Sequence, residues 1–296
     1  MQGEDQNRIS VFRDSHMVPL MPCAHTGGGE QPWSGLLLER HSVPAMEIPE
    51  HEHGELCLHL QVSGEDSMEW WSGGRYGVEN SASGSMILLP PGTRDRILWH
   101  GASERLILSL RSSLLSRIAE ESGAAAPEFQ SRWSFQDASM QHLIADMGRE
   151  ASQGWPLGHL YADLVAMGLA TTLLRRHSTA PIDPGEIRGG MPLPRLRRAM
   201  EYMTENLDSD LGLEETARQL SLSPFHFARE FRSSTGQTPY QYLLDQRIER
   251  AKHLLKGRNW SVQEIASMAG FRSPNSFVRS FRQRVGQTPG DWRKTA

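Results

Sequence analysis

Short alternating or apolar runs, separated by glycine, proline and asparagine, fill the chain from about residue 35 to residue 112. Examples are ELCLHLQVSG, GSMILLPPGT and ERLILSLR. Strands of this length, repeated about every ten residues, are typical of an antiparallel sandwich or barrel. We therefore predict a β-barrel over residues 31–112, preceded by a loose polar arm over residues 1–30 that contains at most one strand.

The apolar period becomes helical after this region. Three segments, SSLLSRIAEES, DASMQHLIADMGREAS and HLYADLVAMGLATTLLRRH, predict an all-helical annex over residues 113–178, and Asp137 suits the N-cap of the second helix. The helical annex has apolar positions that make up most of one helix face. That face either packs inside the monomer or pairs with a second copy of the chain. Its members are Leu157, Leu160, Leu164, Met167, Leu169, Leu173 and Leu174.

A segment rich in proline and glycine, STAPIDPGEIRGGMPLP, follows the annex and has no apolar period. We predict a linker over residues 179–192, and everything after it, residues 193–296, reads as helical. The expected fold class is therefore multi-domain α+β, with an all-α domain at the C-terminal end.

The C-terminal domain contains an internal repeat. SPFHFAREFRSSTGQTP at residues 223–239 and SPNSFVRSFRQRVGQTP at residues 273–289 lie 50 positions apart, and an amphipathic segment precedes each. Serine is a good N-cap and proline suits the first helical position, so each copy predicts a helix, a tight turn and a second helix. A long helix from Pro239 to about Lys256 joins the copies. The expected buried residues are Ala217 and Ala266, where the helices cross, and Phe227, Phe231, Phe277 and Phe281.

Two helix-turn-helix units of this kind would present their second helices to the major groove of DNA. Arginine there reads guanine, asparagine reads adenine, and apolar atoms contact the thymine methyl group. The alternative is a packed helix pair of an all-α domain that binds no DNA. The residues expected on the open faces are Phe225, His226, Ala228, Arg229 and Arg232 in the first unit, and Asn275, Ser276, Val278, Arg279 and Arg282 in the second.

The charge distribution favours the DNA-binding interpretation. The 296 residues carry a net charge of −4, but residues 191–296 hold 17 Lys and Arg against 11 Asp and Glu. The first 190 residues hold 14 against 24. A basic module for a polyanion is thus joined to an acidic module with another task.

The C-terminal third resembles the DNA-binding domain of the AraC/XylS family of bacterial transcription regulators. The family's motifs occur here as Arg229-x-Phe231-Arg232, Gly236-Gln237-Thr238-Pro239, Arg247-x-x-x-Ala251-x-x-Leu254-Leu255, Glu264-Ile265-Ala266, Gly270-Phe271 and Gly286-Gln287-Thr288-Pro289. The resemblance implies that Phe225, Ala228 and Arg229 face bases in the first unit, and Asn275, Ser276 and Arg279 in the second. Ala228 departs from the polar residue that relatives often carry. With the helix caps and the arginines expected to contact phosphate, the complete predicted DNA-binding set is Ser223, Phe225, His226, Ala228, Arg229, Arg232, Arg272, Ser273, Asn275, Ser276, Arg279 and Arg282.

The β region carries a polar motif of its own. With the period of two that a strand has, one face carries His51, His53, Glu55, Cys57, His59 and Gln61, and the other carries Leu56, Leu58, Leu60 and Val62. Together with Gly84-x5-Pro90-Pro91-Gly92-x2-Asp95, this segment resembles the cupin barrel, which commonly precedes AraC-type DNA-binding domains. The candidate ligand-binding residues are His51, His53, Glu55, His59, Arg94, Asp95 and Trp99.

Three interpretations of these histidines stay open. They contact an organic ligand, they form structural hydrogen bonds, or His51, His53 and either Glu55 or Asp95 hold a divalent metal. Metal-binding cupins place their glutamate later than Glu55 and carry a second-motif histidine where this chain has Asp95. We therefore predict no metal ligand and no cofactor.

The predicted function is a DNA-binding transcription regulator whose barrel senses a small molecule of unknown identity, and not an enzyme. The alternatives are a cupin metalloenzyme with a helical appendage and a DNA-repair protein that reacts through cysteine. Cys23 and Cys57 form no CxxC pair, which suits a reducing cytoplasm, and no apolar run is long enough for a membrane. The expected partners are promoter DNA and a second copy of the chain in a homodimer implied by the resemblance, with RNA polymerase as a further candidate.

Overall fold

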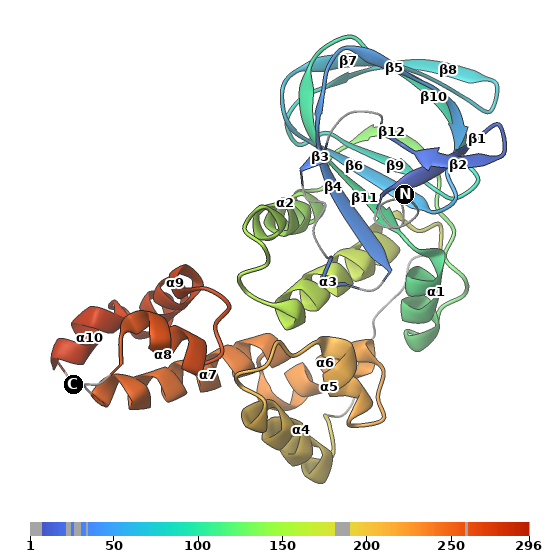
Figure 1. Ribbon diagram of the computed structural model, residues 1–296. Coiled ribbons are helices and arrows are strands. Elements are labelled where there is room, and N and C mark those ends of the chain that lie inside the picture. Colours follow the sequence, from blue (N-terminus) through green and yellow to red (C-terminus); the bar gives the residue numbers. More distant parts are fainter. Residues whose placement is uncertain are drawn as a thin grey trace. The chain divides into compact units, whose positions relative to one another are not determined.

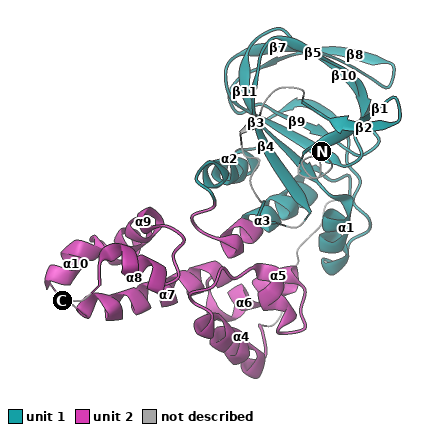
Figure 2. Ribbon diagram, in the orientation of Figure 1, with its two compact units in different colours: residues 1–154, 165–183 teal, residues 155–164, 184–296 magenta. Residues whose placement is uncertain are grey.

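The computed structural model describes residues 8–21, 25–26, 31–33, 35–180, 190–257 and 260–295. The chain divides into two compact units, residues 1–154 with 165–183, and residues 155–164 with 184–296 (Figure 2). Cys23 and the central part of the predicted linker, residues 181–189, lie outside the described residues.

Strands of the first unit form two six-stranded sheets (Figure 1). One sheet has the order β2-β1-β5-β10-β7-β8 and the other β12-β9-β6-β11-β4-β3. The strands are β1 Ser10–Arg13, β2 His16–Pro19, β3 His25–Thr26, β4 Leu36–Val43, β5 Met46–Glu52, β6 Leu56–Ser63, β7 Asp66–Ser72, β8 Arg75–Ser81, β9 Met86–Leu89, β10 Arg94–Trp99, β11 Ser103–Leu110 and β12 Arg132–Phe135. The prediction of a barrel was wrong, because the sheets do not close: within the described residues, the short outer strands β3 and β12 end the second sheet without pairing to the first. We call this unit the N-terminal sandwich.

Two further predictions for this unit were wrong in detail. The arm contains three strands, of which β1 and β2 form a hairpin whose turn residues Asp14 and Ser15 have positive φ, and β3 pairs with β4. The helical annex contains β12, which pairs with β9. These strands are too short for an alternating pattern to stand out. In addition, β1 and β12 pair with strands far away in the sequence, β5 and β9.

The register of the second sheet places polar residues in rows. In β4, β11 and β6, His41 lies opposite Arg105 and Arg105 opposite Gln61. These three side chains are buried, and Arg105 donates a hydrogen bond to Gln61 Oε1 at 3.0 Å. The alternate residues of β6, such as Leu58, are buried on the other face of the sheet, against which α2 packs. The interior of the sandwich is therefore partly polar.

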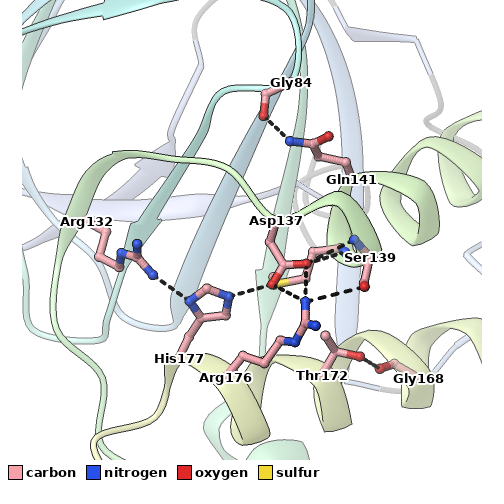
Figure 3. A network of polar contacts seen from close by, with 10 residues as sticks. Gly84, Arg132, Asp137, Ser139, Gln141, Gly168, Thr172, Arg176 and His177 are labelled. Atoms are coloured by element: carbon pink, nitrogen blue, oxygen red, sulfur yellow. Dashed lines mark hydrogen bonds and ion pairs between the residues drawn. The ribbon is translucent and has the colours of Figure 1, made fainter.

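Three helices follow β11 in the chain: α1 Ser112–Glu121, α2 Ala138–Ser152 and α3 His159–His177. Asp137 caps α2 as predicted, accepting hydrogen bonds from the N–H groups of Ser139 and Met140 (Figure 3). The same carboxylate binds Arg176 at 2.9 Å and His177 at 3.1 Å at the end of α3. Burial opposes its charge, but the Met140 N–H, Arg176 and His177 together lower the pKa of Asp137.

Helix α3 belongs to both units, since residues 155–164 group with the second. Four leucines of its predicted apolar face are buried within the chain, which confirms the monomer alternative for them: Leu160, Leu169, Leu173 and Leu174. The remaining three are partly buried.

In the second unit the described residues from 190 onward form helices joined by short turns. The helices are α4 Leu193–Glu205, α5 Leu213–Arg218, α6 Pro224–Thr235, α7 Pro239–Lys256, α8 Val262–Met268, α9 Pro274–Val285 and α10 Pro289–Thr295. The long helix α7 has the predicted bounds. Within the described part of the chain, every helix is too short or too polar to cross a bilayer.

Candidate functional site

Two helix-turn-helix units, α5 with α6 and α8 with α9, flank α7 in the second unit. Their predicted cores are confirmed. Ala217 and Ala266 are buried where the helices pack, and so are the phenylalanines at matching positions of α6 and α9: Phe227, Phe231, Phe277 and Phe281. The sequence repeat is therefore a structural repeat.

The caps fix where α6 and α9 begin. The Ser223 hydroxyl accepts a hydrogen bond from the His226 N–H at 3.2 Å, and the Ser273 hydroxyl accepts one from the Ser276 N–H at 3.1 Å. Each helix ends at a glycine in the left-handed conformation, Gly236 with φ 75° and Gly286 with φ 86°. Capped ends hold the side chains between them in a fixed orientation.

Helix α9 presents a basic, polar face. Asn275, Arg279 and Arg282 are exposed, and they line a hollow of about 660 Å³ with Val278, Gln283 and Thr288. Ser276, which the resemblance placed against bases, is buried, and its hydroxyl donates to the Ser273 carbonyl at 2.8 Å. The face available to a nucleic acid is therefore narrower than predicted.

Helix α6 also exposes fewer of its predicted DNA-binding residues than the sequence indicated. Arg232 is exposed, whereas His226, Ala228 and Arg229 are partly buried. Phe225, predicted to face bases, is only 7% exposed, and the Arg229 guanidinium lies 5.4 Å from the centre of its ring. A buried ring offers little surface to a base, and the observed partner of Phe225 is the guanidinium of Arg229.

A group of contacts that the sequence analysis missed holds the helix-turn-helix units in place. Asp210 binds Arg272 at 3.0 Å and accepts a hydrogen bond from the His159 N–H at 3.0 Å. Buried Arg247 donates hydrogen bonds to the carbonyls of Leu207 and Ser209 at 2.9 and 2.8 Å. The motif in α7 marked Arg247, but neither its contacts nor Asp210 could be predicted, because Asp210 and the partners of Arg247 lie in a loop.

Asp163 of α3 accepts a hydrogen bond from the Leu213 N–H at 2.8 Å, at the first residue of α5. Burial raises the pKa of Asp163 to about 6 from an ordinary 3.8. The folded state thus favours the protonated carboxyl. This contribution to stability is complete below about pH 3.8, decreases as the pH rises, and is lost above about pH 6.

We expect Asp163→Asn to remove this pH dependence, because the amide oxygen still accepts the Leu213 hydrogen bond but carries no charge. Relative to wild type, the variant should gain unfolding free energy between pH 4 and pH 7, by up to about 3 kcal/mol. Urea unfolding followed by helical circular dichroism at both pH values measures the change. Exposed Asp208→Asn is the control, and an Asp163→Asn effect equal at the two pH values would contradict the assignment.

A second polar cluster lies inside the N-terminal sandwich. His51 of β5 pairs with Asp95 of β10, and the His53 backbone bonds to Gly92 and Thr93 before β10. His53 Nε2 lies 3.1 Å from Asp95 Oδ1, and His51 Nε2 lies 3.8 Å from Asp95 Oδ2. All three side chains are buried. Burial lowers the pKa of His51, although Asp95 opposes this shift.

The other predicted ligand residues do not join this cluster as expected. The chain reverses between β5 and β6, so Glu55 lies in the turn and accepts hydrogen bonds from the Ser112 N–H and hydroxyl, at 2.7 and 2.9 Å. Arg94 points outward and binds Glu52. His59 and Trp99 are buried with ring centres 6.4 Å apart, and burial lowers the pKa of His59 far below its ordinary value. The prediction of one shared face through Glu55 was therefore wrong.

Comparison with protein families identifies a match to the helix-turn-helix domain model over residues 216–295. This range begins within α5 and ends in α10, so it includes both helix-turn-helix units.

The matches to individual proteins extend further along the chain. XylDLEGF operon transcriptional activator 3 from Pseudomonas putida is 25% identical over 249 residues, which are 80% of this chain and 72% of that protein. The transcriptional activator RhaR from Klebsiella pneumoniae is 30% identical over 157 residues, 53% of this chain and 54% of RhaR. Among solved structures, the DNA-binding domain of AdpA in complex with a target DNA is 35% identical, covering 34% of this chain and 91% of that domain with a TM-score of 0.33.

Proposed function

Because the chain belongs to the AraC/XylS family of transcription regulators, we propose that it is a transcriptional activator that reads promoter DNA with the exposed faces of α6 and α9. The single observation that carries this proposal is the duplicated, capped helix-turn-helix with arginines on its open faces. The family consists of regulators and not enzymes, which sets aside the metalloenzyme and repair alternatives.

The two helices contribute unequally in this proposal. Asn275 and Arg279 of α9 are exposed polar groups suited to base edges, with adenine and guanine as their natural partners. Arg229 of α6 is partly buried, so it reads a base only through the part of its guanidinium that extends past Phe225. Arg232 and Arg282 supply contacts to phosphate, which position the protein without reading sequence.

The function is tested by selecting genomic fragments with purified full-length protein, at near-physiological salt and with excess random competitor DNA. Nonspecific binding weakens steeply with salt, whereas specific binding survives. Recovery of a shared sequence motif supports the proposal. Binding of all sequences alike, lost at that salt, would overturn it.

Arginine variants of α9 then separate base contacts from phosphate contacts. We expect Arg279→Ala to reduce the preference for the selected base at one position by about 5- to 150-fold, the effect of about 1 to 3 kcal/mol. Arg282→Ala should weaken cognate and random DNA by the same factor. Fluorescence anisotropy with a set of single-base variants of the selected site measures both.

Arg75→Ala is the control for charge, since Arg75 is exposed in β8 of the sandwich and its loss should change neither quantity. An equal loss on cognate and random DNA for Arg279→Ala and Arg282→Ala would contradict the assignment of roles.

The regulatory part of the proposal concerns the N-terminal sandwich. A polar interior, with Arg105, Gln61 and His59 buried between the sheets, suits recognition of a small molecule better than a purely structural core does. The proposed protein acts in the cytoplasm as a homodimer, whose two-fold symmetry would match paired DNA sites. A ligand shifts such a protein between DNA-binding states only by its different affinity for them.

A further inference from the structure

We infer that His51, His53 and Asp95 form a binding site for one divalent transition-metal ion inside the N-terminal sandwich. The inference concerns a different unit from the DNA-binding surface and stands independently of the proposed function. It also revises the expectation from the sequence, which contained no metal ligand.

The strands bring the three side chains together. Pairing of β5 with β10 places His51 directly opposite Asp95, so both side chains leave the sheet on the same face. His53 follows β5 and is held by two backbone hydrogen bonds, from its N–H to the Thr93 carbonyl at 2.9 Å and from the Gly92 N–H to its carbonyl at 2.7 Å. One ligand atom from each of the three side chains lies within 4.8 Å of the others.

The polar atoms that face one another in this cluster are buried. The three residues are at most 2% exposed. Among the residues that the structure describes, no group forms a hydrogen bond of acceptable geometry with His51 Nε2, His53 Nε2 or either carboxylate oxygen of Asp95. Buried polar atoms are nearly always satisfied, so four such atoms aimed at one another call for a missing partner.

The orientation of the His51 ring also favours a bound cation. Its Nδ1 lies 2.9 Å from the Pro49 carbonyl, and a carbonyl only accepts, so Nδ1 carries the proton. In the neutral ring, Nε2 then presents a lone pair toward the acceptor oxygens of Asp95. Two acceptors facing each other repel unless a cation lies between them. A backbone carbonyl that fixes the ring in this way is the usual second partner of a metal-bound histidine.

The donor set indicates the class of metal. Two imidazole nitrogens and one carboxylate suit Mn²⁺, Fe²⁺, Co²⁺, Ni²⁺ or Zn²⁺, whereas Ca²⁺ and Mg²⁺ prefer oxygen ligands alone. Glu55 is not available as a further ligand, because it caps α1 through Ser112. Three protein ligands leave coordination positions open to water or a small ligand.

One residue of the cluster, His51, lies beside a pocket at the molecular surface. His51 lines a pocket of about 530 Å³ with Phe12, Glu50, Glu52 and Arg94, among others. Its carboxylates favour the approach of a cation.

The test is a titration of full-length protein, without a histidine tag and stripped by a chelator, with Co²⁺. We expect one Co²⁺ per chain with visible d–d absorption, displacement by Zn²⁺, and a raised melting temperature with Zn²⁺ but not with Ca²⁺. His53→Gln and Asp95→Asn should weaken binding by at least about 100-fold, since losing an outer partner alone costs about 10- to 100-fold. The matched control is His100→Gln, which removes a histidine from a surface pair with Glu69 in the same unit.

Measurements on wild type keep the inference testable if the variants fail to fold. X-ray absorption of the Zn²⁺ form should show two imidazole ligands and no sulfur. Absence of stoichiometric metal in wild type would overturn the inference and leave a proton shared between the histidines and Asp95. A bound metal with a sulfur ligand or without imidazole, or one that His100→Gln removes, would overturn it as well.

Discussion

Replacement of Gly270 by alanine should unfold the second helix-turn-helix unit or come close to doing so. Gly270 ends α8 with φ 87°, and an added Cβ would lie 1.8 Å from the Leu207 carbonyl oxygen and 2.9 Å from Arg247 Nε. The same two groups are joined by the buried hydrogen bond from Arg247 to Leu207. The clash is with backbone, so a side-chain rotation cannot relieve it.

The expected loss of unfolding free energy exceeds about 4 kcal/mol, combining the left-handed conformation with the steric overlap and a broken buried hydrogen bond. Urea unfolding followed by circular dichroism measures it, and binding to the selected DNA should disappear in parallel.

Gly286→Ala separates the cost of the left-handed conformation from the cost of the steric overlap. Gly286 has nearly the same φ, 86°, but no neighbouring atom within 4 Å of an added Cβ. We therefore expect only the conformational cost, about 1 to 2 kcal/mol. If both variants lost the same free energy, the contact with Leu207 would not be the reason for glycine at position 270.

Phe277→Ala is the second change with a large expected effect. The ring is fully buried and packs against Phe271 and Phe281, with centres 5.0 and 5.6 Å away. It belongs to a cluster formed by α7, α8 and α9: Leu244, Ile248, Ala251, Leu255, Ile265, Ala266, Ala269, Phe277 and Phe281. Truncating a buried phenylalanine leaves a cavity and costs about 3 to 5 kcal/mol.

The expected result is a large decrease in the midpoint of urea unfolding, and weaker DNA binding because α9 loses the packing that holds it. The neighbouring Val278→Ala is the control. Val278 is only partly buried and packs at the edge of the same cluster, so its truncation should cost less than about 1.5 kcal/mol. A Phe277→Ala cost as small as that of Val278→Ala would show that the cluster does not support α9.

The helical half of the chain was predictable because its signals are local. Ser223 and Ser273 start helices through their own hydroxyls, and Gly236 and Gly286 end them through their own φ. Each such signal acts within four residues of the chain. The long helix α7, between the two helix-turn-helix units, is predicted by its own apolar period and its Thr238 capping box.

The sandwich was less predictable because its pairing is long-range. Alternation continues through the sequence from His51 to Gln61, but the chain turns at Gly54, and the alternation does not show this turn. Sheet closure depends on whether outer strands find partners, which no single segment encodes. The pairing of His51 with Asp95, 44 positions away, therefore had to come from the structure.

Some errors at the candidate sites could have been avoided. Neighbouring residues on a strand point to opposite faces, so Arg94 and Asp95 could not both line one interior. Phe225 and Ser276 are a different case: each lies at the first turn of its helix, where the preceding helix and the cap decide burial. A pattern of helical spacing alone does not contain that information.

The ion pair between Arg272 and Asp210 has a consequence for how salt affects DNA binding. An arginine that meets a phosphate normally displaces condensed counterions, which contributes about 0.9 to the slope of log K against log salt. Arg272 already has a carboxylate partner at 3.0 Å. If it turned to a phosphate, Asp210 would gather a cation from solution as the DNA released one. Arg272 would then add a contact to phosphate while leaving the net number of released counterions almost unchanged. The number of phosphate contacts deduced from the slope would therefore be smaller than the number of basic residues that contact the DNA.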